Sequence, residues 1–321
     1  MTTADHPGAE AVIGALARLA GARDVQAAHS VLADREDGTV VRVGGVVVKA
    51  HAPGSEPREL GDRLAVAAHP LLRGILLPPC GGPAPETVAG RVVTRWPYGE
   101  PVDRHAPHAA PWEAAATLLA RLHTVPLRPA PGAGPGQRSW QLAESPAGPA
   151  PLPPMRAPLK AALAVARLDG VPDSAAVRTV RRAWERLPPA GGSGVVALCH
   201  GDLHLGQLVR VPAPDGDWVL IDVDDLGTGD PAWDLARPAM WFAAGLLEPE
   251  GWARFLGAYR AAGGVAVPAG GDPWAYLDLP ARAVAVQTAA TAVAKAHRES
   301  RELDDAESRI LAACERITRL E

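Results

Sequence analysis

The hydrophobic period of the chain changes along its length, and this change constrains the fold more than any other feature. Short β-branched runs occupy Thr39 to Val43 and Val46 to Val48, joined by Gly44-Gly45, which predicts antiparallel strands and a tight turn. From Pro111 onward, apolar residues recur mainly at the spacing of amphipathic helices. The sequence therefore predicts an α+β protein, β-rich at its N-terminal end and mainly helical at its C-terminal end.

The same patterns predict the remaining elements. In the N-terminal part we expect helices at Glu10 to Leu19 and Pro57 to Ala68, and strands at Gly74 to Leu77 and Arg91 to Thr94. In the C-terminal part we expect helices at Pro111 to His123, Pro158 to Leu168, Ser174 to Leu187, Pro231 to Gly245, Gly251 to Ala262 and Leu303 to Leu320, and strands at Val195 to Leu198 and Trp218 to Ile221. These elements give two lobes, residues 1–95 and 100–321, with a hinge at 96–99 and a loop insertion rich in Pro and Gly at 127–155.

Charge and cysteine usage exclude several classes of function. The formal net charge is −4 with acids and bases interspersed, so there is no basic stripe to bind a nucleic-acid backbone. Cys80, Cys199 and Cys314 lack CxxC spacing, which argues against a disulfide framework or a thiolate metal site and fits a reducing cytoplasm. The alanine-rich run from Ala281 to Ala296 is interrupted by charged residues, and the N-terminus lacks a basic signal region. We expect a soluble cytoplasmic protein without a membrane partner, as a monomer or homodimer.

Polar residues follow two short apolar runs at the points where the predicted strands end. The run Val195 to Leu198 is followed closely by the segment His200 to Gln207, with the sequence HGDLHLGQ. About twenty residues on, Val219 to Ile221 is followed by the acidic segment Asp222 to Asp225. Because loops at strand ends are held by rigid structure, these two segments can converge on one cation.

These residue types match what phosphoryl transfer needs, namely a carboxylate to orient the attacking hydroxyl, oxygen ligands for Mg²⁺ and a lysine on the phosphates. Asp202 and Gln207 are five residues apart, which is the spacing of the base and the metal-binding amide in the kinase catalytic loop. Asp222 is the expected main Mg²⁺ ligand, and Asp224 is either a further ligand or the start of a solvated turn. Lys49 closes a valine-rich strand and is either the phosphate contact or a solvated strand end.

The segments HGDLHLGQ, LIDVDD and GDPAWDLA resemble the aminoglycoside phosphotransferase family, relatives of protein kinases that modify small molecules. The resemblance is most specific over Leu198 to Ala236, with support from LARLH at 119–123 and VVVK at 46–49. It implies a protein-kinase-like two-lobed fold with the active site between the lobes, ATP or GTP as phosphate donor, and Mg²⁺. The HGDLHLGQ form is also similar to maltokinases within the broader family.

The resemblance implies roles for individual residues. Asp202 is similar to the family's catalytic aspartate, Asp222 to its metal-binding aspartate and Lys49 to its phosphate-contacting lysine. The expected partner of Lys49 is Glu59, on the following predicted helix, with Glu56 just before that helix as the alternative. Gln207 stands where the family usually has Asn. Its carbonyl oxygen lies one methylene farther out, so Mg²⁺ binding there requires a withdrawn backbone or a bridging water.

The same resemblance assigns the remaining site residues. The hinge residues expected to contact the nucleobase are Arg95, Trp96 and Tyr98. The residues expected to support the catalytic loop are His200, His204 and Asp234. The family's glycine-rich phosphate loop has no clear counterpart, since the segment Asp34 to Gly38 offers a single glycine.

The expected acceptor is a hydroxyl of an aminoglycoside or of another natural-product antibiotic, which would confer resistance or self-protection. A sugar such as maltose or glucosamine is the nearest alternative. A group of acids near the C-terminus suits either a cationic antibiotic or a helix start; its members are Glu299, Glu302, Asp304, Asp305 and Glu307.

Two interpretations from other classes remain open. In the first, the chain is a catalytically impaired nucleotide-binding relic, in which Gln207 and the missing glycine loop reflect lost chemistry. In the second, His200, Asp202 and His204 alternate along an extended segment and hold zinc in a hydrolase.

Overall fold

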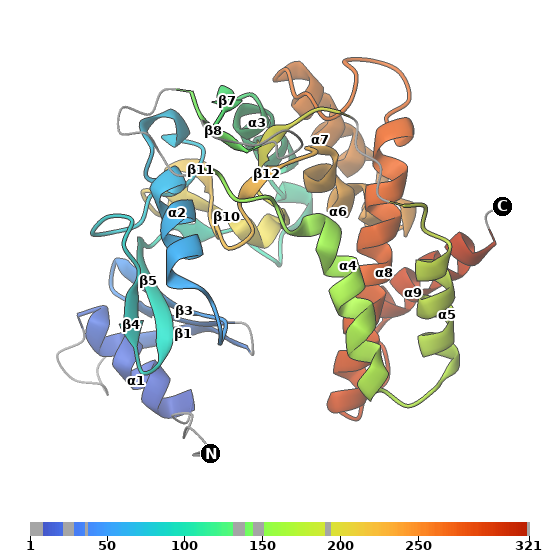
Figure 1. Ribbon diagram of the computed structural model, residues 1–321, viewed down its shortest axis with the longest axis horizontal. Helices are drawn as coiled ribbons and strands as arrows, with labels where there is room; N and C mark the ends of the chain where they lie inside the picture. The colour runs from blue at the N-terminus through green and yellow to red at the C-terminus, as the bar shows by residue number, and fades with distance from the viewer. Residues whose placement is uncertain are drawn as a thin grey trace. The chain divides into compact units, whose positions relative to one another are not determined.

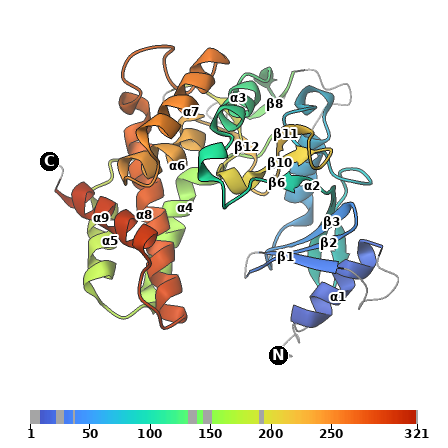
Figure 2. The same cartoon turned by 180° about the vertical axis from the view of Figure 1, so that it is seen from behind.

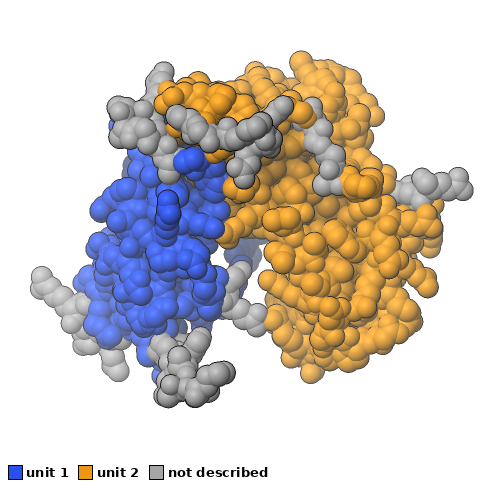
Figure 3. Space-filling view, in the orientation of Figure 1, with its two compact units in different colours: residues 1–105, 144–153, 206–224 blue, residues 106–143, 154–205, 225–321 orange. Residues whose placement is uncertain are grey.

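The computed structural model describes residues 9–21, 29–35, 38–130, 139–143, 151–189 and 194–319. The chain forms two compact units, shown in different colours in Figure 3. Unit 1 comprises residues 1–105, 144–153 and 206–224, and unit 2 comprises residues 106–143, 154–205 and 225–321. Unit 1 is built around an antiparallel sheet and unit 2 is mainly helical, which confirms the predicted α+β class.

Unit 1 contains a five-stranded antiparallel sheet in the order β1-β2-β3-β5-β4. Its strands are β1 (His29–Arg35), β2 (Gly38–Val43), β3 (Val46–His51), β4 (Glu86–Val88) and β5 (Arg91–Pro97). Strands β2 and β3 pair Val43 with Val46 and Val40 with Lys49. The turn between them starts at Gly44, whose φ of 57° is a conformation that glycine adopts freely.

Unit 1 also contains two helices. They are α1 (Ala9–Leu19) and α2 (Pro57–Ala67). The buried side chains of Val12 and Leu16 on α1 pack against Val41, Val48 and Val93 of the sheet. This apolar layer follows directly from the helical spacing in α1 and the β-branched runs in β2 and β3.

A second, three-stranded sheet in unit 1 has the order β11-β10-β6. Its strands are β6 (Glu100–Pro101), β10 (Leu208–Val211) and β11 (Asp217–Leu220), and short 3-10 turns lie at η1 (Pro70–Leu72) and η4 (Leu205–Gln207). The predicted strand at Gly74 to Leu77 is wrong, because only Leu76 forms an isolated parallel bridge, with Leu220. A turn covers residues 73–75 and includes Gly74, where φ is 70°.

Unit 2 holds the remaining elements. Its helices are α3 (Trp112–His123), α4 (Ala157–Ala166), α5 (Ala175–Glu185), α6 (Ala232–Ala243), α7 (Pro249–Ala261), α8 (Trp274–Arg298) and α9 (Asp305–Thr318), with 3-10 turns η2 (Pro107–Ala109) and η3 (Arg167–Gly170). Its strands are β7 (Leu127–Pro129), β8 (Trp140–Leu142), β9 (Ala197–Cys199) and β12 (Gly227–Gly229). Helix α8 packs against α4, α6 and α9, as the two views in Figures 1 and 2 show. Its many alanines let these neighbouring helices approach closely.

The predicted loop insertion at 127–155 contains regular structure. Strands β7 and β8 pair in antiparallel fashion, with Leu127 opposite Leu142. Burial of Gln141 and Leu142 anchors β8 despite the surrounding Pro and Gly. The parts of the insertion at 131–138 and 144–150 lie outside the described residues.

No helix of the described residues, α8 included, combines the length and the apolar character needed to cross a bilayer.

Candidate functional site

A lysine and two aspartates meet in unit 1, and we call this group, with His51 and Gln207, the Lys49 cluster. The Nζ atom of Lys49, on β3, lies 2.8 Å from Asp222 Oδ1 and 2.9 Å from Asp224 Oδ2. Asp222 follows the end of β11 and has a φ of 68°, a left-handed conformation that Asp tolerates better than most residues. Its Oδ1 also accepts a hydrogen bond of 3.3 Å from the backbone N–H of Asp224.

The charges in this cluster stabilise one another. Burial opposes the positive charge of Lys49, but Asp222 and Asp224 outweigh this effect and raise the lysine's pKa. Burial likewise opposes the negative charge of Asp224, but Lys49 and His51 outweigh it and hold its pKa well below the usual range. Lys49 and Asp224 are therefore an ammonium and a carboxylate at neutral pH.

The cluster also contains His51, which the sequence reasoning missed. His51 is buried, its Nδ1 lies 3.1 Å from Asp224 Oδ2 and its Nε2 lies 2.7 Å from Thr94 Oγ1. Thr94 Oγ1 also accepts a hydrogen bond of 2.8 Å from Trp96 Nε1. Because an ionised carboxylate only accepts, Nδ1 of His51 carries the proton that it shares with Asp224. The two-residue period of a strand, which puts His51 on the same face as Lys49, could have revealed it.

The donor set of the cluster fits a hard divalent cation. Gln207 Nε2 lies 3.4 Å from Asp222 Oδ2, so the amide lies beside the carboxylate predicted to hold metal. Asp224 Oδ1 is buried and accepts no hydrogen bond within the described part of the chain, although His51 Nδ1 is 2.9 Å away. Carboxylate and amide oxygens are the ligands that Mg²⁺ prefers, so Asp222, Asp224 and Gln207 are suited to hold it.

A second group surrounds Asp202 in unit 2, directly after β9, and we call it the Asp202 cluster: Asp202, Lys160, Asp225 and Arg237. Asp202 Oδ1 accepts a hydrogen bond of 2.7 Å from Arg237 Nη2 and lies 3.4 Å from Lys160 Nζ. Lys160 Nζ is also 2.6 Å from Asp225 Oδ2. Burial raises the pKa of Asp202, but Lys160, Arg237 and His204 outweigh it and leave the pKa well below its usual value. Asp202 is therefore a carboxylate across the neutral range.

The loop that carries Asp202 is held by a buried carboxylate on α6. Asp234 accepts hydrogen bonds from the backbone N–H groups of His200, at 2.6 Å, and Gly201, at 2.7 Å. His123 Nε2 lies 2.9 Å from the same carboxylate, and His123 Nδ1 lies 2.7 Å from the hydroxyl of Tyr259. These contacts place Asp234 where the sequence expected a brace, and its effect on activity stays a prediction.

The same loop requires glycine at position 201. Its φ is 82°, and a Cβ atom there would lie 2.5 Å from the backbone oxygen of Asp225. Only a residue without a side chain permits this close approach.

The predicted partner and hinge residues lie elsewhere in unit 1. Lys49 forms its ion pairs with the two aspartates, whereas Glu59 pairs with Arg63 one turn along α2, at 3.3 Å. The structure therefore does not bring Glu59 to Lys49. The carboxylate of Glu59 is half exposed, so water screens its ion pair with Arg63.

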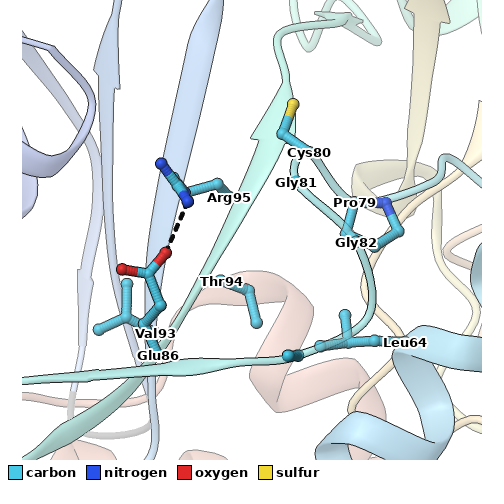
Figure 4. Close-up of a pocket in the computed structure, with 10 residues that line it drawn as sticks. Leu64, Pro79, Cys80, Gly81, Gly82, Glu86, Val93, Thr94 and Arg95 are labelled. Carbon is cyan, nitrogen blue, oxygen red and sulfur yellow. Dashed lines mark ion pairs between the residues drawn. The ribbon is translucent and has the colours of Figure 1, made fainter.

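Arg95 lines a pocket of about 210 Å³ in unit 1, shown in Figure 4. Its guanidinium pairs with Glu86 at 2.7 Å, and Cys80 and Leu64 lie around the same space. Trp96 and Tyr98 do not line this pocket. Tyr98 donates to Glu100 Oε2 at 2.8 Å and lies under the guanidinium of Arg42, while Trp96 is buried.

The zinc interpretation requires His200, Asp202 and His204, and within the described residues their possible ligand atoms do not lie close together. His200 is fully buried and its Nδ1 accepts a hydrogen bond of 3.4 Å from the backbone N–H of Asp202. Within the described ranges, the group with ligand atoms close enough for a metal is instead His123, Cys199 and Asp234. That group is buried, and its His and Asp are already hydrogen-bonded to each other.

Asp234→Asn should destabilise the protein by about 3 kcal/mol, because an amide offers one acceptor where the carboxylate serves three donors and leaves buried N–H groups unpaired. Thermal or urea unfolding measures the loss. Asp169→Asn is the matched control, since its carboxylate is exposed beside Arg181 and should contribute less than about 1 kcal/mol. Equal effects of the two substitutions would show that Asp234 does not hold the loop.

The chain is similar to known proteins in sequence and in structure. The model of the phosphotransferase enzyme family matches residues 29–277. No curated protein sequence matches the chain. Among solved structures, a choline/ethanolamine kinase family protein from Mesorhizobium loti is 16% identical, with a TM-score of 0.55 over 95% of this chain and 94% of that chain.

Two further structures are similar at the same level. Macrolide 2'-phosphotransferase MphH from Brachybacterium faecium is 18% identical, with a TM-score of 0.50 over 93% of this chain and 96% of its own. A thermostable mutant of aminoglycoside phosphotransferase APH(4)-Ia, in ternary complex with AMP-PNP and hygromycin B, is 14% identical, with a TM-score of 0.54 over 91% and 94%. These likenesses show a shared kinase-like fold. Because the family model spans most of the sequence and confirms the resemblance of its motifs, the chain belongs to the phosphotransferase enzyme family.

Proposed function

We propose that the protein transfers the γ-phosphate of ATP or GTP to a hydroxyl group of a small molecule, with Mg²⁺ as cofactor. Membership of the phosphotransferase family supports the reaction type. The observation that carries the residue assignment is the Lys49 cluster, in which one partly buried lysine lies within 2.9 Å of two carboxylates. This is the combination of a phosphate contact and metal ligands that phosphoryl transfer requires.

The proposed roles follow from the chemistry of each group. Lys49 contacts the nucleotide phosphates, while Asp222, Gln207 and Asp224 hold Mg²⁺. The bound ion would neutralise negative charge on the phosphates. Asp202 orients the acceptor hydroxyl, and its lowered pKa supports positioning over strong base catalysis.

The step proposed for Asp202 is an in-line displacement. The acceptor oxygen forms a bond to the γ-phosphorus while the bond from that phosphorus to the bridging oxygen breaks, which releases the nucleoside diphosphate. The hydroxyl proton leaves through Asp202 to solvent. Positioning and electrostatics, rather than a covalent phosphoenzyme, supply the rate enhancement.

The acceptor class follows from the motif rather than from the fold. We propose that the acceptor is a hydroxylated natural-product antibiotic and that the protein acts in the cytoplasm, in resistance or self-protection. A sugar of the maltose type is the alternative acceptor. The resemblance of the segment His200 to Gln207 to both groups supports either acceptor.

Asp202→Asn should lower kcat by about 10²–10⁴-fold, because the amide cannot accept the hydroxyl proton. Stabilisation by ATP and Mg²⁺ should persist, since those ligands are assigned to the Lys49 cluster. Coupled-assay turnover and thermal unfolding measure the two effects, with Asp169→Asn as control. Unchanged turnover in Asp202→Asn would remove Asp202 from the mechanism. If nucleotide stabilised the wild type but the wild type turned over no acceptor, the relic interpretation would be favoured.

His51→Ala should raise the Mg²⁺ concentration needed for half-maximal stabilisation by ATP by about 10–100-fold, because Asp224 loses the group that orients it. His51→Asn should restore most of the affinity, since its amide nitrogen takes the place of Nδ1 beside Asp224. His51→Gln should not, because its amide nitrogen reaches the Nε2 side, beside Thr94. Equal affinities in the Asn and Gln variants would contradict this role.

A further inference from the structure

Three of the C-terminal acids predicted to suit a cationic antibiotic, Glu299, Asp304 and Glu307, already have partners. Arg301 Nε lies 2.8 Å from Glu299, and its Nη1 lies 2.7 Å from Glu307. The side chain of Asp304 accepts the backbone N–H of Glu307 at 2.8 Å, and Glu307 returns the contact in a capping box at the start of α9. These carboxylates therefore hold the connection from α8 to α9 and are poorly placed to attract a polycation.

The Asp202 cluster offers a polycation no net attraction either. Its two carboxylates, Asp202 and Asp225, are matched by two cations, Lys160 and Arg237. All four side chains are at most 30% exposed, so their charges are only partly screened by water. A multiply charged acceptor that approaches Asp202 would meet two positive groups within 3.4 Å of the carboxylate that must orient its hydroxyl.

Apolar side chains flank the lysine of this cluster. Leu159 and Leu163 on α4 are each 62% exposed, and they lie four residues apart, on one stripe of the helix. Lys160 lies between them in sequence, and at 100° per residue Leu163 is about 60° away around the helix. Ala161 and Ala164 are buried on the face that packs against α8. The exposed leucines thus form an apolar strip next to a side chain that reaches Asp202.

We propose that the acceptor is a hydroxylated molecule of largely apolar surface and low positive charge, bound on α4 against Leu159 and Leu163 with its reacting hydroxyl at Asp202. This proposal rests on the proposed phosphotransfer and narrows its acceptor class. Burial of the two leucines supplies affinity, whereas Lys160 and Arg237 exclude polycations. An aminoglycoside rich in amino groups is accordingly disfavoured, as is a small polar sugar that cannot cover the strip.

An acceptor panel tests the class. Erythromycin, chloramphenicol and rifampicin represent hydroxylated acceptors of low charge, hygromycin B represents the polycations and maltose the polar sugars. Release of ADP is measured with Mg²⁺ and ATP, and thermal unfolding with the same nucleotide is measured separately. A kcat/KM at least about tenfold higher for a compound of the first group than for hygromycin B and maltose is expected. Preference for hygromycin B or maltose, or turnover of none of the first group, overturns the inference. If Mg²⁺ and ATP do not stabilise the wild type against thermal unfolding, the proposed function itself is overturned.

A double variant tests the location. Leu159→Ser with Leu163→Ser should raise KM for the preferred acceptor by about tenfold with little change in kcat, because the hydroxyl still meets Asp202. Its thermal unfolding should match the wild type, since both side chains are exposed. Tyr276→Ser, another exposed apolar position of unit 2 at 40%, is the matched control and should leave KM unchanged. An unchanged KM in the double variant would contradict the proposed binding site. If the double variant also changed from dimer to monomer in sedimentation, with KM unaltered, the apolar strip would be assigned to contact with a second copy of the chain.

Discussion

A partly buried lysine between two aspartates is the interaction on which the candidate site in unit 1 depends. Lys49 comes from β3, while Asp222 and Asp224 follow β11, so the ion pairs join the main sheet to the smaller one. Because these side chains are only partly exposed, removing one partner would leave a charge that water screens incompletely. The cluster therefore holds the segment after β11 and at the same time supplies the charges that the proposed phosphoryl transfer requires.

Unit 2 places its key carboxylate by a different device. Asp234 accepts two backbone N–H groups of the loop and receives a third contact from His123, so the loop is fixed by a side chain that is itself buried. Gly201 allows the loop to pass close to Asp225. The loop's conformation thus leaves Asp202 partly exposed beside Lys160 and Arg237.

The sequence could predict groups whose position follows from a local pattern. Lys49 lies on the valine-rich strand β3, Asp222 follows β11 and Asp234 lies within a motif, so their approximate places could be predicted from period and spacing. The places of Lys160 and Arg237 could not be predicted in this way, because α4 and α6 bring them to Asp202 only through tertiary packing. For the same reason the predicted pairing of Glu59 with Lys49 is not seen: Lys49 pairs with Asp222 and Asp224, far away in sequence, and Glu59 pairs with Arg63. Strands β7 and β8 were missed because their Pro- and Gly-rich surroundings mask short pairings.

The most direct test of the Lys49 cluster is thermal unfolding with ATP or GTP, with and without Mg²⁺, for the wild type and Asp222→Asn. Asn also tolerates the left-handed backbone at this position, so the substitution removes mainly charge. At 100 times its dissociation constant the nucleotide should add about 2.7 kcal/mol of stability to the wild type. The account predicts that this Mg²⁺-dependent gain is lost in Asp222→Asn. No gain with either nucleotide, or the same gain in both proteins, would contradict it.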